Sequence, residues 1–279
     1  MKQETKSRSM EVLFKWIMFT AAITGMAMVA GFWPVQGNIP FIVIPSILVL
    51  VLGKPVFFER MKLWTLVIMR VLIVFVVFNM FDGQRYVNII LWMLVINILE
   101  ATFTDLLKHK QILNAISGFA LAIGVFALSG VWVSDAPVGM YYLTNGATFA
   151  ITLMYVIAYT LWNWIFVSYE FSTSVSLMHV GFLLAPIIGS IINSWLGALG
   201  GIGFWLLLRA NSLAIGGWMQ IGNKAWFEQE YHLDWFEKFI NWTHKKSVQT
   251  VFMIINVGLI VALMIMANGA GKIAFPKIF

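Results

Sequence analysis

The stretch YYLTNGATFAITLMYVIAYTLWNWIFV, residues 141–167, contains no charged residue. A helix needs about 20 mostly apolar residues to cross the roughly 30 Å hydrocarbon core of a bilayer. This stretch is therefore long and apolar enough to span a membrane. Six of its polar residues recur at steps of three and four, so they fall on one face of a helix that turns once every 3.6 residues. They are Asn145, Thr148, Thr152, Tyr155, Tyr159 and Asn163.

The composition of the 279-residue chain agrees with a membrane protein. Hydrophobic residues make up 61% of the chain and charged residues 11%, and the mean hydropathy is +0.87. Soluble domains carry roughly 45–50% apolar and about 25% charged residues. The chain has too few charges to cover a surface that faces water, which excludes a soluble protein. We expect one all-α, multi-pass transmembrane domain.

Nine stretches of the sequence are apolar and long enough to span a bilayer, and turn residues such as Pro34 and Gly83 separate them. They are Trp16–Trp33, Ile39–Phe58, Leu63–Phe81, Tyr86–Leu106, Ile112–Val133, Tyr141–Val167, Val175–Leu199, Ile202–Met219 and Val248–Asn268. With the N-terminus in the cytoplasm, 13 of the 18 basic residues fall in cytoplasmic segments, three on the opposite side and two within spans. Membrane proteins show this cytoplasmic excess of Lys and Arg. The sequence predicts nine helices in the cytoplasmic membrane, with the C-terminus outside.

The net charge of +6 follows from this topology, so we expect no nucleic acid as a partner. The chain has no cysteine, which excludes disulfides and thiolate metal sites. We expect no metal and no cofactor, since the histidines are scattered and no lysine lies deep in a span to hold retinal. Asp105 and His109 are four residues apart, and we interpret them as a surface pair.

The segment KAWFEQEYHLDWFEKFINWTHKK, residues 224–246, differs from the rest. Aromatic residues recur at helical spacing with acidic residues between them. The pattern predicts an amphipathic helix on the cytoplasmic side, which would lie in the lipid headgroup layer or pack on the ends of the bundle.

Charged and polar residues within the spans are the candidates for function, because they are costly in hydrocarbon. Arg70 lies roughly 12 Å and Arg209 roughly 15 Å from the cytoplasmic edge, at 1.5 Å of rise per residue. Pro186 also frees a backbone carbonyl in the preceding turn, which must find a partner. Arg70, Arg209, Glu100, Asn163 and His179 share the cytoplasmic half of the bilayer. The candidate substrate-binding residues are Arg70, Asn97, Glu100, Tyr155, Tyr159, Asn163, His179 and Arg209.

The charges at these depths lead to two expectations. Glu100 lies within roughly 3 Å of the depth of Arg70, so we expect the two to form a buried ion pair. Arg209 then has no carboxylate at its depth, and we expect it to contact an anionic ligand or a lipid phosphate.

Three functions fit these residues. The first is a transporter or carrier whose cytoplasm-facing polar site takes a small anionic molecule, with the two arginines holding the anion. The second is a membrane-embedded enzyme that acts on lipids, with His179 or Glu100 as the general base. The third is a non-catalytic subunit that binds partner membrane subunits through its buried charges. The carrier is the interpretation that we carry forward.

Overall fold

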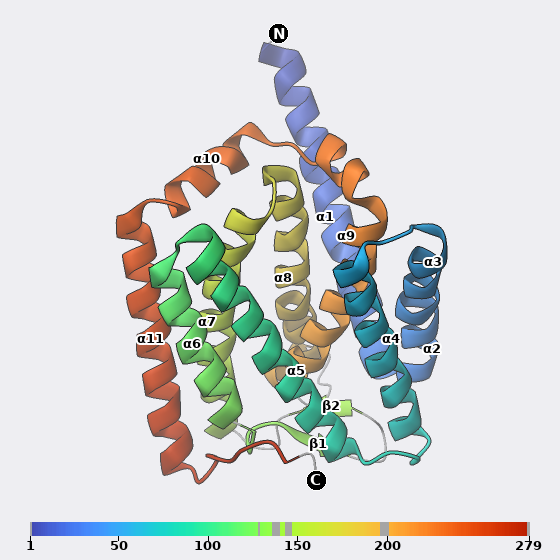
Figure 1. Ribbon diagram of the computed structural model, residues 1–279, viewed down its shortest axis with the longest axis vertical. Helices are drawn as coiled ribbons and strands as arrows, with labels where there is room; N and C mark the ends of the chain where they lie inside the picture. Colours follow the sequence, from blue (N-terminus) through green and yellow to red (C-terminus); the bar gives the residue numbers. More distant parts are fainter. Residues whose placement is uncertain (1, 128, 136–139, 143–146, 196–200, 278–279) are drawn as a thin grey trace.

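The computed structural model describes residues 2–127, 129–135, 140–142, 147–195 and 201–277. Over these residues the protein is a bundle of α-helices with one short two-stranded ribbon (Figure 1). The first five helices are α1 (Lys2–Phe32), α2 (Pro34–Asn38), α3 (Ile44–Leu52), α4 (Phe57–Val77) and α5 (Gly83–Thr104). The remaining helices are α6 (Ile112–Ala127), α7 (Ala147–Glu170), α8 (Thr173–Trp195), α9 (Trp205–Glu230), α10 (Asp234–Thr243) and α11 (Lys246–Gly269).

Short irregular elements join or extend some of these helices. A π-helical turn, Ile39–Val43, joins α2 to α3, and a second one, Asp105–His109, extends α5. A 3₁₀ turn, Gly201–Phe204, leads into α9. Strands β1 (Val133–Asp135) and β2 (Met140–Tyr142) pair antiparallel, with Ser134 opposite Tyr141.

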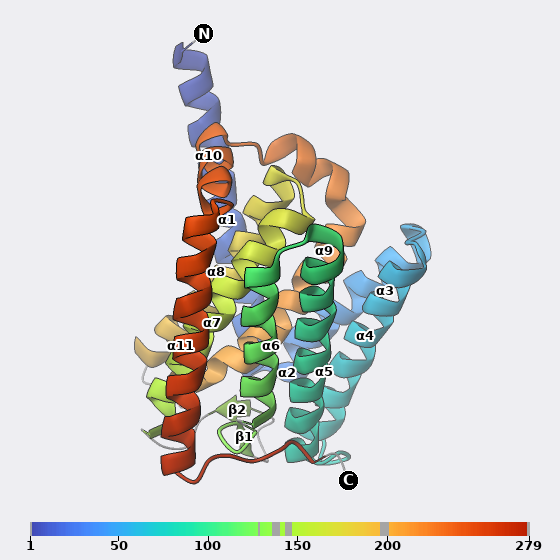
Figure 2. The ribbon, with the colours of Figure 1, turned by 60° about the vertical axis from the view of Figure 1, so that its left-hand side comes forward.

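The two termini lie at opposite ends of the bundle (Figure 1). We call these the N-terminal end and the C-terminal end. The connections α3–α4, α5–α6 and α7–α8 and the helix α10 lie at the N-terminal end, and the β-ribbon lies at the C-terminal end. Figure 2 shows α10 at the N-terminal end of α11. An odd number of crossings would place the termini in this way.

Six helical segments are long and apolar enough to cross a membrane, counted over the part of the chain that the structure describes. They are Ser9–Phe32, Pro34–Leu52, Gly83–His109, Phe149–Glu170, Thr173–Trp195 and Lys246–Gly269. The structure has helices at the other three predicted spans, but these fall short by the same measure. Helix α4 carries Arg60, Lys62 and Arg70, α6 has 16 residues, and α9 contains Arg209 among several polar residues. The structure therefore supports six candidate spans and does not confirm the nine that the sequence predicts.

Large apolar side chains cover the outside of the helices, as expected for a protein in lipid. Ile123 is 64% exposed, Ile254 60% and Ile265 69%. Such a surface is too extensive for a soluble monomer, whose apolar patches are rarely larger than a few hundred Å². The apolar surface and the six candidate spans are compatible with a helical membrane protein.

The segment 224–246 differs from the single amphipathic helix that its pattern predicts. Helix α9 kinks at Asn223, where φ is −135° and ψ is 20°, and continues to Glu230 before α10 begins at Asp234. Phe236 and Ile240 of α10 are buried, and this helix contacts α8 and α11. The large apolar side chains of α10 that remain exposed are Trp235, Phe239 and Trp242. The helix thus packs on the bundle with one face and leaves aromatic side chains exposed on the other.

A close approach of two backbones fixes the turn from α1 into α2. A Cβ atom at Gly37 would lie 2.4 Å from Ala30 Cα and 2.5 Å from Ala30 N. Asn38 Nδ2 closes the same turn by donating to the carbonyl oxygens of Ala30 (2.9 Å) and Pro34 (2.8 Å). Only glycine fits at position 37, because the contacting atoms belong to a helical backbone that cannot rotate away.

We therefore predict that Gly37→Ala destabilises the detergent-purified protein by about 1–3 kcal/mol, the usual cost of overpacking. The matched control is Gly258→Ala in α11, where a Cβ would meet nothing within 4 Å. That change should be neutral or stabilising, since alanine favours a helix over glycine by about 0.5–1 kcal/mol. Thermal unfolding measures both. Equal melting temperatures for the two variants would contradict the close approach.

Candidate functional site

Three aromatic residues and one arginine face each other from α7 and α9. Tyr155 and Tyr159 are four residues apart on α7, as are Trp205 and Arg209 on α9, so each pair shares one face of its helix. The Trp205 ring lies 5.4 Å from the Tyr159 ring and 6.1 Å from the Tyr155 ring, both in edge-to-face geometry. All three rings are fully buried. We call these four residues the Arg209 cluster.

The arginine is held by two neutral groups. Arg209 is 5% exposed, and its Nε donates to Tyr159 Oη at 3.2 Å. Its Nη1 donates to the backbone carbonyl oxygen of Phe182 at 3.3 Å. The guanidinium carbon also lies 5.3 Å from the centre of the Tyr159 ring, which allows a cation–π contact. Neither partner carries a negative charge.

The Phe182 carbonyl is available because of Pro186. Proline has no N–H, so the carbonyl four residues earlier loses its helical partner. In the structure that carbonyl accepts from Arg209 Nη1 and from Ser212 Oγ, at 3.3 and 3.2 Å. The expectation that the freed carbonyl finds a polar partner is confirmed, and the partner is the buried arginine.

No carboxylate pairs with Arg209 among the described residues. The ion pairs of the structure join Lys15 to Glu11 and Glu230, Lys62 to Glu100, Lys108 and His109 to Glu170, and His232 to Asp234. Two polar atoms of the cluster, Tyr155 Oη and Trp205 Nε1, are buried without a hydrogen-bond partner in the described structure. An indole N–H can only donate, so the cluster offers unused donors beside a cation. This arrangement is complementary to the acceptor oxygens of an anion.

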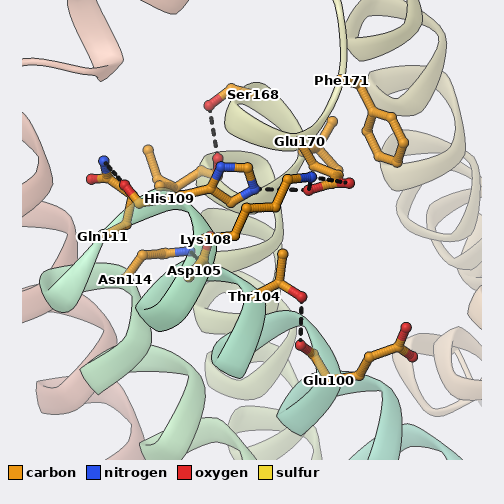
Figure 3. A network of polar contacts seen from close by, with 12 residues as sticks. Glu100, Thr104, Asp105, Lys108, His109, Gln111, Asn114, Ser168, Glu170 and Phe171 are labelled. Carbon is orange, nitrogen blue, oxygen red and sulfur yellow. Dashed lines mark hydrogen bonds and ion pairs between the residues drawn. The ribbon is translucent and has the colours of Figure 1, made fainter.

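The predicted pair of Arg70 and Glu100 is wrong. Arg70 is buried and donates from Nη1 to Asn211 Oδ1, whose amide nitrogen in turn donates to the Ala27 carbonyl at 3.0 Å. The Glu100 side chain is 58% exposed and lies 3.5 Å from Lys62 Nζ. Figure 3 shows it pointing away from the other labelled carboxylates. Rise per residue gave the height of Glu100 along the helix axis but not its direction around that axis.

Arg70 and Arg209 also do not share one site. Asn211, the partner of Arg70, lies two residues after Arg209 and so is rotated from it by about 200° around α9. Arg209 faces α7 and α8, whereas Asn211 faces α1 and α4. The two arginines therefore do not line one cavity, as expected from the sequence, but lie on opposite sides of α9.

The other predicted site residues lie nearer the N-terminal end. His179 Nε2 lies 3.0 Å from Gln220 Oε1, and its ring stacks on Phe171 with centroids 4.4 Å apart. Asn163 is buried on α7, one turn beyond Tyr159, and Asn97 is half-buried on α5. Thr152 is buried on the α7 face that carries the two tyrosines, whereas Asn145 lies outside the described residues.

A second polar network, which sequence analysis missed, lies at the N-terminal end of the bundle, where α5 and α7 end and α6 begins (Figure 3). Glu170 is its centre: Lys108 Nζ donates to both carboxylate oxygens, at 2.8 and 2.9 Å, and His109 Nε2 lies 2.7 Å from Oε2. Asp105 does not pair with His109 on the surface, as we had interpreted, but is fully buried. The spacing of the apolar residues of α5 could have predicted the burial of Asp105, because it continues the same helix face. The buried positions of that face are Leu91, Val95, Ile98, Thr102 and Asp105.

His244, which follows α10, extends this network. It stacks on Tyr169 with centroids 3.8 Å apart, and its Nε2 lies 3.0 Å from Ser168 Oγ. Burial lowers the pKa of His244, so its imidazole is neutral at physiological pH. No group of three or more His, Asp or Glu side chains that could hold a metal ion occurs in the described part of the chain.

Comparison of the chain with protein-family models, with curated proteins and with solved structures found no match. The functional argument therefore rests on the geometry described above.

The two tyrosines of the cluster should respond differently to loss of their hydroxyl groups. Tyr159→Phe leaves Arg209 Nε buried without an acceptor, which costs about 1–3 kcal/mol or more for a charged donor. Tyr155→Phe removes a hydroxyl that has no partner in the described structure, so it should be neutral or stabilising. Chemical or thermal unfolding of the two purified variants measures the difference. A Tyr155→Phe variant that is the less stable of the two would contradict this geometry.

Proposed function

We propose that the protein is a multi-pass membrane carrier for a small anion, and that the Arg209 cluster binds the anion. The observation that carries the proposal is a guanidinium that is 5% exposed and has no carboxylate partner among the described residues. A charge at the centre of a bilayer costs at least about 2.5–3.5 kcal/mol. Arginine cannot escape this cost by losing its proton, because a guanidinium stays protonated in proteins.

The unused donors favour a carboxylate or phosphate as the group bound. Arg209 Nε and Nη1 contact Tyr159 and Phe182, while Nη2 donates to no described residue. Charge-assisted hydrogen bonds from a planar guanidinium suit the oxygens of carboxylates and phosphates. The Trp205 N–H adds a neutral donor. The rings of Tyr155 and Tyr159 beside it suit an anion whose remaining part is small and planar or apolar.

His179 and Gln220 suggest the side from which the anion enters. His179 is one turn from Phe182 towards the N-terminal end, and the two rings lie 5.7 Å apart in edge-to-face geometry. Phe171 stacks on the other side of His179. In the proposed carrier these residues separate the Arg209 cluster from the cytoplasm, and their rearrangement would admit the anion. Asn97 and Asn163 would supply further hydrogen bonds along the route.

A non-catalytic subunit is the second candidate, because one groove on the bundle is open to the side. A groove of about 450 Å³ runs between α7 and α8, with Leu153, Ile157 and Ile191 among its apolar lining residues. It suits a lipid chain or a helix of a partner subunit. Its lining includes no titratable residue and not His179, so it gives no support to a lipid-modifying active site.

We further propose nine crossings of the cytoplasmic membrane, with the N-terminal end in the cytoplasm. The basic residues of the sequence support this topology: 13 fall in segments at the N-terminal end and three in segments at the C-terminal end. If only the six candidate spans crossed, the two termini would lie on the same side.

Single cysteines test this topology, since the chain has none of its own. An impermeant thiol reagent added outside intact cells should label Gln36→Cys and Lys277→Cys, but not Arg60→Cys or Lys238→Cys until the cells are opened. All four side chains are exposed in the structure. Labelling of Lys277→Cys only after the cells are opened would contradict the proposed topology.

Anion binding is tested by comparing Arg209→Lys with the wild-type protein. Inorganic phosphate and benzoate serve as probes of a tetrahedral and a planar anion. At 100 times its Kd, a bound probe should stabilise the wild-type protein by about 2.7 kcal/mol, seen as a rise in melting temperature. Lysine keeps the charge but loses the planar fork, so Arg209→Lys should fold yet lose this rise.

The matched control is Arg85→Lys, which changes an exposed arginine at the start of α5 and should keep the full response. Equal responses of Arg209→Lys and wild type would overturn the anion site, as would a wild-type protein that neither probe stabilises. Either result would leave the subunit as the better hypothesis.

A further inference from the structure

Asp105 is the only acidic side chain in the buried class among the described residues. It lies in the π-helical turn that extends α5, where its side chain has no exposed surface. Its Oδ2 accepts a hydrogen bond from Asn114 Nδ2 of α6 at 2.6 Å, and its Oδ1 has no hydrogen-bond partner in the described structure. Figure 3 shows the Asn114 amide directed at this carboxyl group.

The basic side chains closest in sequence to Asp105 contact another carboxylate. Lys108 and His109 both turn to Glu170, as Figure 3 shows, at 2.7 to 2.9 Å. No Lys, Arg or His in the described ranges forms an ion pair with Asp105. Glu170 places a second carboxylate in the same network, where it holds both of these basic side chains.

The groups around Asp105 come from every element packed against its turn. They are Lys108 and His109 of the same turn, Asn114 of α6, Tyr169 and Glu170 of α7, and, beyond Tyr169, His244 after α10 and Gln249 of α11. Lys108 and His109 in this set are engaged with Glu170, and burial lowers the pKa of His244. Nothing in the set compensates a negative charge on Asp105.

We propose that Asp105 is a proton-binding site, with the proton on Oδ1 and the Asn114 amide on Oδ2. An ionised carboxylate that is buried without a cation costs several kcal/mol, and binding one proton removes that charge. His109, in the same turn as Asp105, and its partner Glu170 are 11% and 25% exposed, so the proton site adjoins side chains that reach the surface. Uptake adds one proton to the carboxylate and release returns it, so no other reactant is required.

Asn114 connects this proton site to the Arg209 cluster. Its Nδ2 also lies 3.3 Å from the carbonyl oxygen of Trp162 on α7, so one amide group contacts both Asp105 and α7. The Trp162 ring lies 5.8 Å from the Tyr159 ring, and Tyr159 Oη accepts from Arg209. We infer that the carrier moves one proton with each anion, an inference that rests on the proposed anion site. Arg209 would balance the anion and Asp105 would carry the proton.

Infrared spectroscopy of the full-length protein at neutral pH tests the proton site without any anion. The wild-type spectrum should contain the C=O band of a protonated carboxyl group, and Asp105→Asn should lose it. Asn114→Ala should keep the band but shift it, because the hydrogen bond to Oδ2 is gone. The control, Asp82→Asn, changes an exposed carboxylate that caps α5 and should leave the band unchanged. Absence of the band from the wild-type spectrum, or its persistence in Asp105→Asn, would overturn the proton site.

Proton uptake on addition of benzoate, in weakly buffered solution, tests the coupling. The measurement is made at a pH high enough to abolish the infrared band of the anion-free protein, where Asp105 is ionised. There, wild-type protein should take up about one proton per bound benzoate, whereas Asp105→Asn should bind benzoate, by its melting temperature, without proton uptake. Benzoate binding to wild type without proton uptake would overturn the coupling. Failure of benzoate and phosphate to bind at all would overturn the proposed anion site, while the infrared band would still decide the proton site.

Discussion

Hydrocarbon offers no hydrogen-bond partners, so every polar group that a membrane helix carries into the bilayer must be satisfied within the protein. One such group organises the centre of this bundle. Pro186 leaves the Phe182 carbonyl of α8 without its helical partner, and Arg209 of α9 donates to that carbonyl and to Tyr159 of α7. Three helices therefore meet at one guanidinium. The neutral groups satisfy its hydrogen bonds but not its charge, and the proposed anion would compensate that charge.

The placement of the other charges follows from the same constraint. Most ion pairs of the described structure lie at the N-terminal end, where side chains such as Lys62 and Glu100 are exposed and contribute little, as surface pairs usually do. The buried ionisable groups Arg70, Arg209 and Asp105 are each bound by neutral partners. A bundle that only needed to be stable would gain from apolar residues of similar size at these positions. Their presence favours ligand and proton binding as the reason.

Much of this architecture could be predicted from the sequence, because a long apolar run shows the position of a helix directly. The buried stripe of Thr152, Tyr155, Tyr159 and Asn163 was also predictable from its spacing. The direction in which an isolated polar side chain points from its helix could not be predicted. Glu100 and Asp105 lie on different faces of one extended helix, and the π-helical turn at Asp105 departs from the 3.6-residue period on which face assignments depend. Which face is buried depends on α6 and α7, which are distant in sequence. The kink at Asn223 likewise has no signal in the aromatic spacing.

The central claim is that Arg209 holds an anion within a membrane bundle and not a carboxylate of its own chain. Electron cryomicroscopy of the full-length protein, purified in native lipid without added ligand, tests this most directly. We expect non-protein density in contact with the Arg209 guanidinium and the Trp205 N–H, with no Asp or Glu side chain at ion-pair distance. A carboxylate of the chain paired with Arg209, or a cluster closed by apolar side chains with no density beside the guanidinium, would contradict the account.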